Sequence, residues 1–132
     1  MKIYKRLVME YKYFSRHGDP NIACRCGCGL SIEDMDRTFM TRIDVARQIA
    51  NIPFIIISGI RCPAHNNNVS TTGFDGPHTT GQALDIFVRN SNERYIIRRV
   101  LIMLGFNRFG TAETFLHVDS SPDHPKNVEW LY

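Results

Sequence analysis

The chain has 132 residues, a formal net charge of +3, and 43% hydrophobic and 22% charged residues. This length suits one domain with its own core, and the composition excludes a disordered or fibrous protein. We therefore expect a single folded domain over residues 1–132.

Charge and hydropathy exclude further classes. The basic residues are scattered, with no run of five or more, so nucleic-acid binding is not indicated. No stretch approaches a membrane span, and the segment Met1 to Glu10 has no apolar run of signal-peptide length. We expect a monomer without nucleic-acid or membrane partners that is synthesised in the cytoplasm without a signal peptide.

The first half of the chain predicts an arm, a helix and a strand. Residues 1–23 indicate a short strand or extended arm and then loop, which continues to Gly29. Ser31 is suited to cap a helix whose first turn is acidic and which ends before Pro53. Its apolar face has a spacing of three and four residues: Ile32, Met35, Phe39, Ile43, Ala46 and Ala50. The apolar run Phe54 to Ile57 then predicts a buried strand.

The second half predicts a long loop, two strands and a helix. Residues 61–80 are rich in Pro, Asn, Ser, Thr and Gly and indicate a long loop. We expect strands over 83–88 and 115–119, separated by a helix that Asn90-Ser91 begins and Gly105 ends. This order predicts an α+β domain in which a small, mainly antiparallel sheet packs against two main helices.

Four cysteines at positions 24, 26, 28 and 62 leave several alternatives. Cysteines two residues apart bridge each other poorly, so a cytoplasmic chain favours free or metal-bound thiols here. Packing thiols are the simplest interpretation, and one disulfide to Cys62 is an alternative. A structural metal site with Cys62 or His17 as fourth ligand is another, although zinc ribbons use Cys-x-x-Cys spacing.

His78, Asp85 and His117 form a candidate metal site. Two imidazoles and a carboxylate are a set that holds zinc and leaves a fourth position open for water. His78 ends the long loop, Asp85 lies on the next strand, and Gly81 between them suits a tight turn. Taken singly, each residue has an ordinary interpretation: His78 as a solvated loop residue, Asp85 as a cap or ion-pair partner, and His117 as a core histidine.

Three motifs resemble, in order and spacing, those of the zinc D-alanyl-D-alanine carboxypeptidases. They are Ser58-Gly-Ile-Arg61-Cys-Pro-Ala-His-Asn66, His78-x-x-Gly81-x-Ala-x-Asp85 and Phe115-x-His117-x-Asp119. The wider superfamily includes D-alanyl-D-alanine dipeptidases, L-alanyl-D-glutamate endolysins and the hedgehog signalling domain. The resemblance runs from about Phe14 to Asp119. The chain departs from it at Gly76, where Ser is usual, and at 71–74, where paired glycines are usual.

The resemblance implies one zinc ion per chain, held by His78, Asp85 and His117. It implies that Arg61 grips a carboxylate or carbonyl oxygen of the substrate, a task suited to a planar guanidinium, whereas a structural salt bridge is the alternative. The implied substrate is the peptidoglycan stem peptide, cut in carboxypeptidase-like or endolysin-like fashion after release of the protein to the cell wall. A phage or prophage lysis enzyme fits this description.

The implied general base is a carboxylate that takes a proton from water during metal-assisted amide hydrolysis. Several branches of the superfamily place an acid three residues before the last ligand, where this chain has Thr114. We expect Glu113 to be the base, although a regular strand would put it about 13 Å from His117. Asp119 is the runner-up or a group that orients a ligand. The alternative function is an inactive zinc-containing module for wall binding or virion structure.

Overall fold

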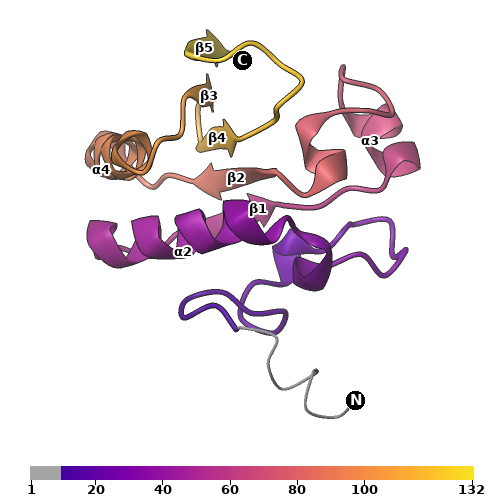
Figure 1. Ribbon diagram of the computed structural model, residues 1–132, viewed down its shortest axis with the longest axis horizontal. Coiled ribbons are helices and arrows are strands. Elements are labelled where there is room, and N and C mark those ends of the chain that lie inside the picture. The colour runs from indigo at the N-terminus through magenta and orange to yellow at the C-terminus, as the bar shows by residue number, and fades with distance from the viewer. Residues whose placement is uncertain (1–9) are drawn as a thin grey trace.

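A computed structural model describes residues 10–132 (Figure 1). The arm predicted over residues 1–23 lies partly outside this range, and the segment to which the expectation about a signal peptide applies lies almost wholly outside it. Residues 10–23 contain turns and the 3-10 helix Pro20–Ile22, with no strand. No helix within residues 10–132 has the length and apolar character needed to cross a membrane.

The described residues form an α+β domain around one five-stranded sheet, which confirms the predicted class. The strands are β1 (Ile55–Ser58), β2 (Ala83–Phe87), β3 (Arg108–Thr111), β4 (Phe115–Asp119) and β5 (Val128–Leu131). Their order is β1-β2-β4-β3-β5, and all neighbours are antiparallel except β3 and β5. The two central strands, β2 and β4, are therefore far apart in sequence but adjacent in space.

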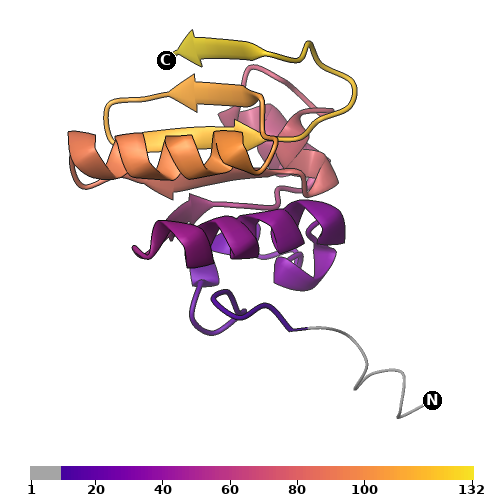
Figure 2. The same cartoon turned by 60° about the vertical axis from the view of Figure 1, so that its left-hand side comes forward.

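Two long helices cover one face of the sheet. Helices α2 (Arg37–Ala50) and α4 (Ser91–Met103) contact each other and lie side by side against the strands (Figure 2). The core between the layers is apolar and fully buried, and includes Phe39, Ile43, Ile97, Leu101, Leu84, Ile86, Leu116 and Val118. Because side chains alternate along a strand, the residues between these apolar positions on β2 and β4 point to the opposite face.

The first helix begins later than its sequence predicts. Ser31 precedes only a 3-10 turn, Ile32–Asp34, and α2 starts at Arg37 with Asp36 as its cap, whose side chain accepts from Phe39 N at 2.9 Å. Between the two helices Met35 is extended, with ψ of 148°. The chain is drawn out here because Asp36 N donates to Gly81 O at 2.9 Å, a contact that no local pattern reveals.

The predicted loop over residues 61–80 contains two helical segments. Helix α3 (Pro63–Val69) begins after Cys62, whose sulfur accepts from His65 N, and has Pro63 at its first position. A 3-10 helix, Pro77–Thr80, follows. The second long helix is as predicted: Asn90 caps α4 by accepting from Glu93 N at 2.9 Å.

Candidate metal centre

His78 is held with one ring nitrogen turned toward the sheet. Its Nδ1 lies 2.7 Å from Gly59 O, and its backbone O accepts from Arg61 N at 3.0 Å. A carbonyl oxygen only accepts, so Nδ1 must carry the ring proton. The other ring nitrogen, Nε2, faces Asp85 and lies 3.5 Å from its Oδ2.

Gly81 makes the turn that separates His78 from β2. Its φ is +72°, in the left-handed region, which confirms the predicted tight turn. A Cβ at this position would lie 2.8 Å from Asp34 O and from Asp36 N. The glycine therefore permits both the turn and the close approach of the backbone that precedes α2.

Asp85 and His117 face each other across the two central strands. They are direct partners in the β2–β4 register, and His117 Nδ1 lies 2.8 Å from Asp85 Oδ1. Ligand atoms of His78, Asp85 and His117 all lie within 4.8 Å of one another, and all three residues are buried. The structure thus brings together the three residues predicted as metal ligands.

Asp119 fixes the other side of the His117 ring. His117 Nε2 lies 2.7 Å from Asp119 Oδ2, while Asp119 Oδ1 accepts from Arg108 Nε at 2.6 Å and from Ser121 N at 3.1 Å. Both carboxylate oxygens are thereby engaged, and the residue is fully buried. This arrangement is the one in which a carboxylate orients a ligand histidine and sets which nitrogen stays protonated.

The site is built to hold positive charge. Burial alone would raise the pKa of Asp85, but hydrogen bonds from His117 and His78 outweigh it and hold that pKa well below its usual value. Burial would lower the pKa of His117, but its hydrogen bonds to Asp119 and Asp85 raise it. The His117 imidazole thus lies between two carboxylates that favour its protonated form, and a divalent cation would satisfy the same negative charge.

These residues line a cleft of about 580 Å³. Arg61 lies on its wall, where Nη1 donates to Asn66 Oδ1 at 3.1 Å and Nη2 to Ser58 Oγ at 3.0 Å. Its Nη2 is also 3.6 Å from Asp85 Oδ2, so the ion pair considered from the sequence is present, with 17% of the Arg61 side chain still exposed.

Glu113 lies elsewhere. It is exposed in the turn between β3 and β4, and it is not among the residues that line the cleft. Arg94 holds this turn by donating to Glu113 O and Ala112 O, each at 2.8 Å. Of the two carboxylates predicted as general base, only Asp119 lies at the cleft.

Three residues that follow the last motif line the cleft and were not predicted as site residues: His124, Trp130 and Tyr132. His124 Nδ1 lies 2.6 Å from Ser121 Oγ, and the Trp130 ring is centred 5.4 Å from the His117 ring. All three follow Asp119, where the motifs end. Their places depend on the parallel pairing of β5 with β3, and the only available signal was the single tryptophan of the chain.

A protein-family model described as Peptidase M15 matches residues 16–119. The chain belongs to the Peptidase M15 family. This confirms the resemblance found in the motifs, and it supports a hydrolase of the peptidase class whose relatives depend on zinc. No curated protein and no solved structure matches the chain. The M15 match contains the three candidate ligands, Arg61 and Asp119, and it ends before His124, Trp130 and Tyr132.

The donor set fits the zinc of an M15 peptidase. It offers two imidazole nitrogens and a carboxylate, the composition of a catalytic site that keeps one position open. The second nitrogen of each histidine is already occupied, by Gly59 O for His78 and by Asp119 for His117. The remaining nitrogens both lie against Asp85.

Proposed function

We propose that this chain is a zinc peptidase that hydrolyses an amide bond in the stem peptide of bacterial peptidoglycan. The observation that carries the proposal is the buried set of His78, Asp85 and His117 at a cleft that also contains Arg61. Membership of a peptidase family supports the reaction class. The motif resemblance to enzymes that cut stem peptides supports the substrate class.

In this proposal His78, Asp85 and His117 hold one zinc ion. When bound, zinc supplies Lewis-acid polarisation of the scissile carbonyl and makes a water molecule more acidic. Asp85 supplies the negative charge that favours a cation, and Gly59 O and Asp119 keep the two imidazoles in the required tautomers. All three ligands are buried, so the ion would bind on groups that are already fixed.

Arg61 is proposed to bind the substrate. Ser58 and Asn66 hold its guanidinium, so little conformational freedom is lost when it pairs with a carboxylate or carbonyl oxygen. Its contact with Asp85 keeps this positive charge beside the proposed metal ligands, where negative charge develops during amide hydrolysis. The structural and the substrate-binding interpretations of Arg61 are thus compatible.

The proton acceptor is proposed among three side chains. Asp119 has both oxygens engaged, so we assign it the positioning of His117. Glu113 would act only if the β3–β4 turn moved toward the cleft. His124 already lines the cleft, and histidine is the side chain that most often acts as a general base.

Three matched variants separate these roles: Glu113→Gln, His124→Gln and Asp119→Asn. Loss of the proton acceptor should lower kcat by about 100-fold or more while zinc stays bound. Loss of a positioning group should lower zinc affinity as well. The acceptor is therefore the residue whose variant loses turnover and keeps zinc.

The proposed function is tested with purified protein and stem peptides that end in D-alanyl-D-alanine, or with intact peptidoglycan. Mass spectrometry of the products should show a defined new peptide terminus, which also identifies the bond. His78→Ala and His117→Ala should each abolish cleavage, whereas His17→Ala, at an exposed position outside the cleft, should not. Full cleavage by either of the first two variants would contradict the proposal.

A second candidate function is a zinc-containing module that binds the cell wall without cutting it. It is favoured by one observation: neither predicted carboxylate base is free at the cleft, because Glu113 lies outside it and Asp119 is engaged. Such a module would sediment with peptidoglycan and retain zinc, yet release no peptide. Any turnover that one of the three acceptor variants removes would exclude it.

A further inference from the structure

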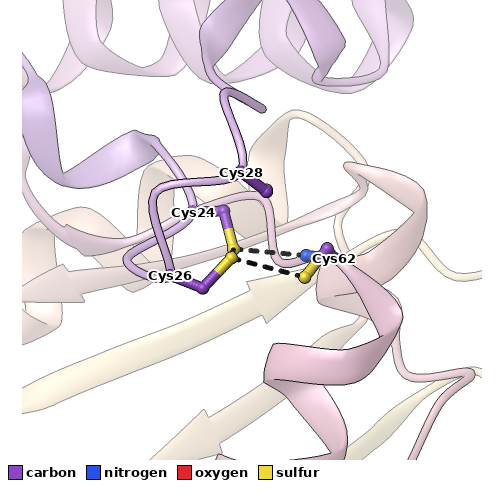
Figure 3. Close-up of side chains that lie close together, drawn as sticks. All are labelled: Cys24, Cys26, Cys28 and Cys62. Carbon is purple, nitrogen blue, oxygen red and sulfur yellow. Dashed lines mark hydrogen bonds between the residues drawn. The ribbon is translucent and has the colours of Figure 1, made fainter.

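The four cysteines converge on one point away from the cleft, although they come from two distant segments. Cys24, Cys26 and Cys28 lie on one loop and Cys62 precedes α3 (Figure 3). Their sulfur atoms all lie within 4.8 Å of one another. The Sγ–Sγ distance is 3.4 Å between Cys24 and Cys26 and 3.6 Å between Cys26 and Cys62.

These spacings fit one tetrahedral metal ion. Sulfurs in a disulfide are about 2.05 Å apart, and all four cysteines here are free. Zinc binds thiolate sulfur at about 2.3 Å, so the edges of a tetrahedron of four sulfurs are about 3.8 Å. Approaches of 3.4 and 3.6 Å lie near that edge length, and a group confined to 4.8 Å has no space for a cluster of several irons.

Glycines allow the closely spaced cysteines to face the same point. Gly27 has φ of +81° and Gly29 has φ of +98°, so a left-handed backbone conformation directly follows Cys26 and Cys28. Cys24 N donates to Leu30 O at 2.9 Å and closes the loop. Cys-x-Cys spacing thus converges here although zinc ribbons use a longer step.

Backbone amides already point at two of the sulfurs. Cys62 N donates to Cys24 Sγ at 3.4 Å, and His65 N donates to Cys62 Sγ at 3.4 Å. Such bonds favour a sulfur that carries negative charge, as a metal-bound thiolate does. They also connect the cysteine loop directly to the segment that begins α3.

We propose that Cys24, Cys26, Cys28 and Cys62 bind a second, structural zinc ion. Four thiolates fill the tetrahedron and leave no position for water, so this site would take no part in hydrolysis. Zinc is the metal class because all ligands are soft thiolates and the space suits a single ion. His17, the other fourth ligand considered from the sequence, is exposed and lies outside the converging group.

The proposed cysteine site would stabilise the segment of the cleft wall that carries Arg61. Cys62 follows Arg61, whose backbone N donates to His78 O, and Ile60 N donates to Ile22 O at 2.9 Å. Arg25 also reaches across and donates to Ile57 O at 2.8 Å. A metal ion joining residues 24–28 to Cys62 would therefore fix the segment that carries Arg61 and supports His78.

The test is zinc content per chain, measured in parallel variants purified under reducing conditions. The expected values are about two for the wild type and His17→Ala, and about one for Cys26→Ser/Cys28→Ser and for His78→Ala/His117→Ala. If only the histidine variant loses zinc, the cysteine site is overturned and the peptidase site stands. If only the cysteine variant loses zinc, the cysteine site stands and the proposed peptidase site is overturned.

Cobalt substitution provides a readout that needs no folded variant. Co²⁺ added to metal-free wild-type protein should give an intense near-ultraviolet thiolate-to-metal band together with visible bands of a tetrahedral site. Thiol titration under denaturing conditions should find four free thiols after metal removal. Absence of the thiolate band, bound iron in place of zinc, or fewer than four thiols would each overturn the proposal.

Discussion

Asp119 Oδ1 accepts a hydrogen bond from Arg108, and Asp119 Oδ2 contacts His117 Nε2. A buried ion pair thus fixes the imidazole that faces Asp85. The Arg108 Nε to Asp119 Oδ1 distance is 2.6 Å, and both side chains are buried. A carboxylate held in this way cannot turn without leaving the buried Arg108 charge unpaired. The orientation of His117 is therefore set before any metal binds.

Asp119→Asn should lower zinc affinity at the histidine site by about 10- to 100-fold, because the ring of His117 loses its fixed partner. Competition with a chelating indicator measures this affinity. Asp123→Asn, an exposed position in the same segment, is the matched control and should leave it unchanged. An Asp119→Asn protein that keeps wild-type zinc affinity and loses only turnover would instead identify Asp119 as the base.

Gly81→Ala should destabilise the fold and the site together. The φ of +72° costs about 1–2 kcal/mol for a residue with a side chain, and the new Cβ would overlap backbone atoms at 2.8 Å. Gly105→Ala isolates the first effect, because φ there is +91° and the nearest atom is the flexible Arg42 Nη2 at 3.8 Å. Urea unfolding should show a larger loss for Gly81→Ala, with reduced zinc content. Equal losses in the two variants would contradict the close approach.

The local parts of this structure could be predicted from the sequence. The strand that holds His117 and the helix that Asn90 begins follow from apolar periodicity and a cap, and both formed as predicted. The ligand set came from motif resemblance. These features depend on residues close together in the chain or on short patterns with fixed spacing.

What escaped prediction depends on contacts between distant segments. Helix α3 is rich in asparagine, a composition that predicts a loop. It is held instead by buried Asn66, whose side-chain nitrogen donates to Thr72 Oγ1 at 2.8 Å and to Gly73 O at 2.6 Å. The start of α2 shifted because Asp36 pairs with Gly81. Strand β5 forms only by pairing with β3, so the position of Trp130 has no local signal.

Trp130→Ala should weaken substrate binding without loss of zinc. The ring lines the cleft next to His117, and the Arg108 guanidinium lies 5.2 Å from its centre. Removal of this aromatic wall should raise KM several-fold for a stem peptide and change kcat less, since aromatic contacts contribute about 1 kcal/mol or more. Leu131→Ala, one residue on and 83% exposed, is the control. An unchanged KM for Trp130→Ala would remove β5 from the substrate site.

The stability of the metal-free protein should fall as the pH rises above neutral. The pKa of His117 is raised in the folded chain by its contacts with Asp119 and Asp85. These ion pairs therefore stabilise the fold fully below the unfolded pKa of a histidine, about 6.5. Their contribution is lost as the pH rises through the raised pKa of the folded chain. The lowered pKa values of Asp85 and Asp119 act in the opposite sense, with stability that is present above about pH 4 and lost in acid. Urea unfolding in the presence of a chelator, at about pH 6 and about pH 9, measures the alkaline limb. His117→Gln carries no titrating ring, so the wild-type decline should exceed that of this variant. Parallel curves would show that His117 is not charged between its two carboxylates.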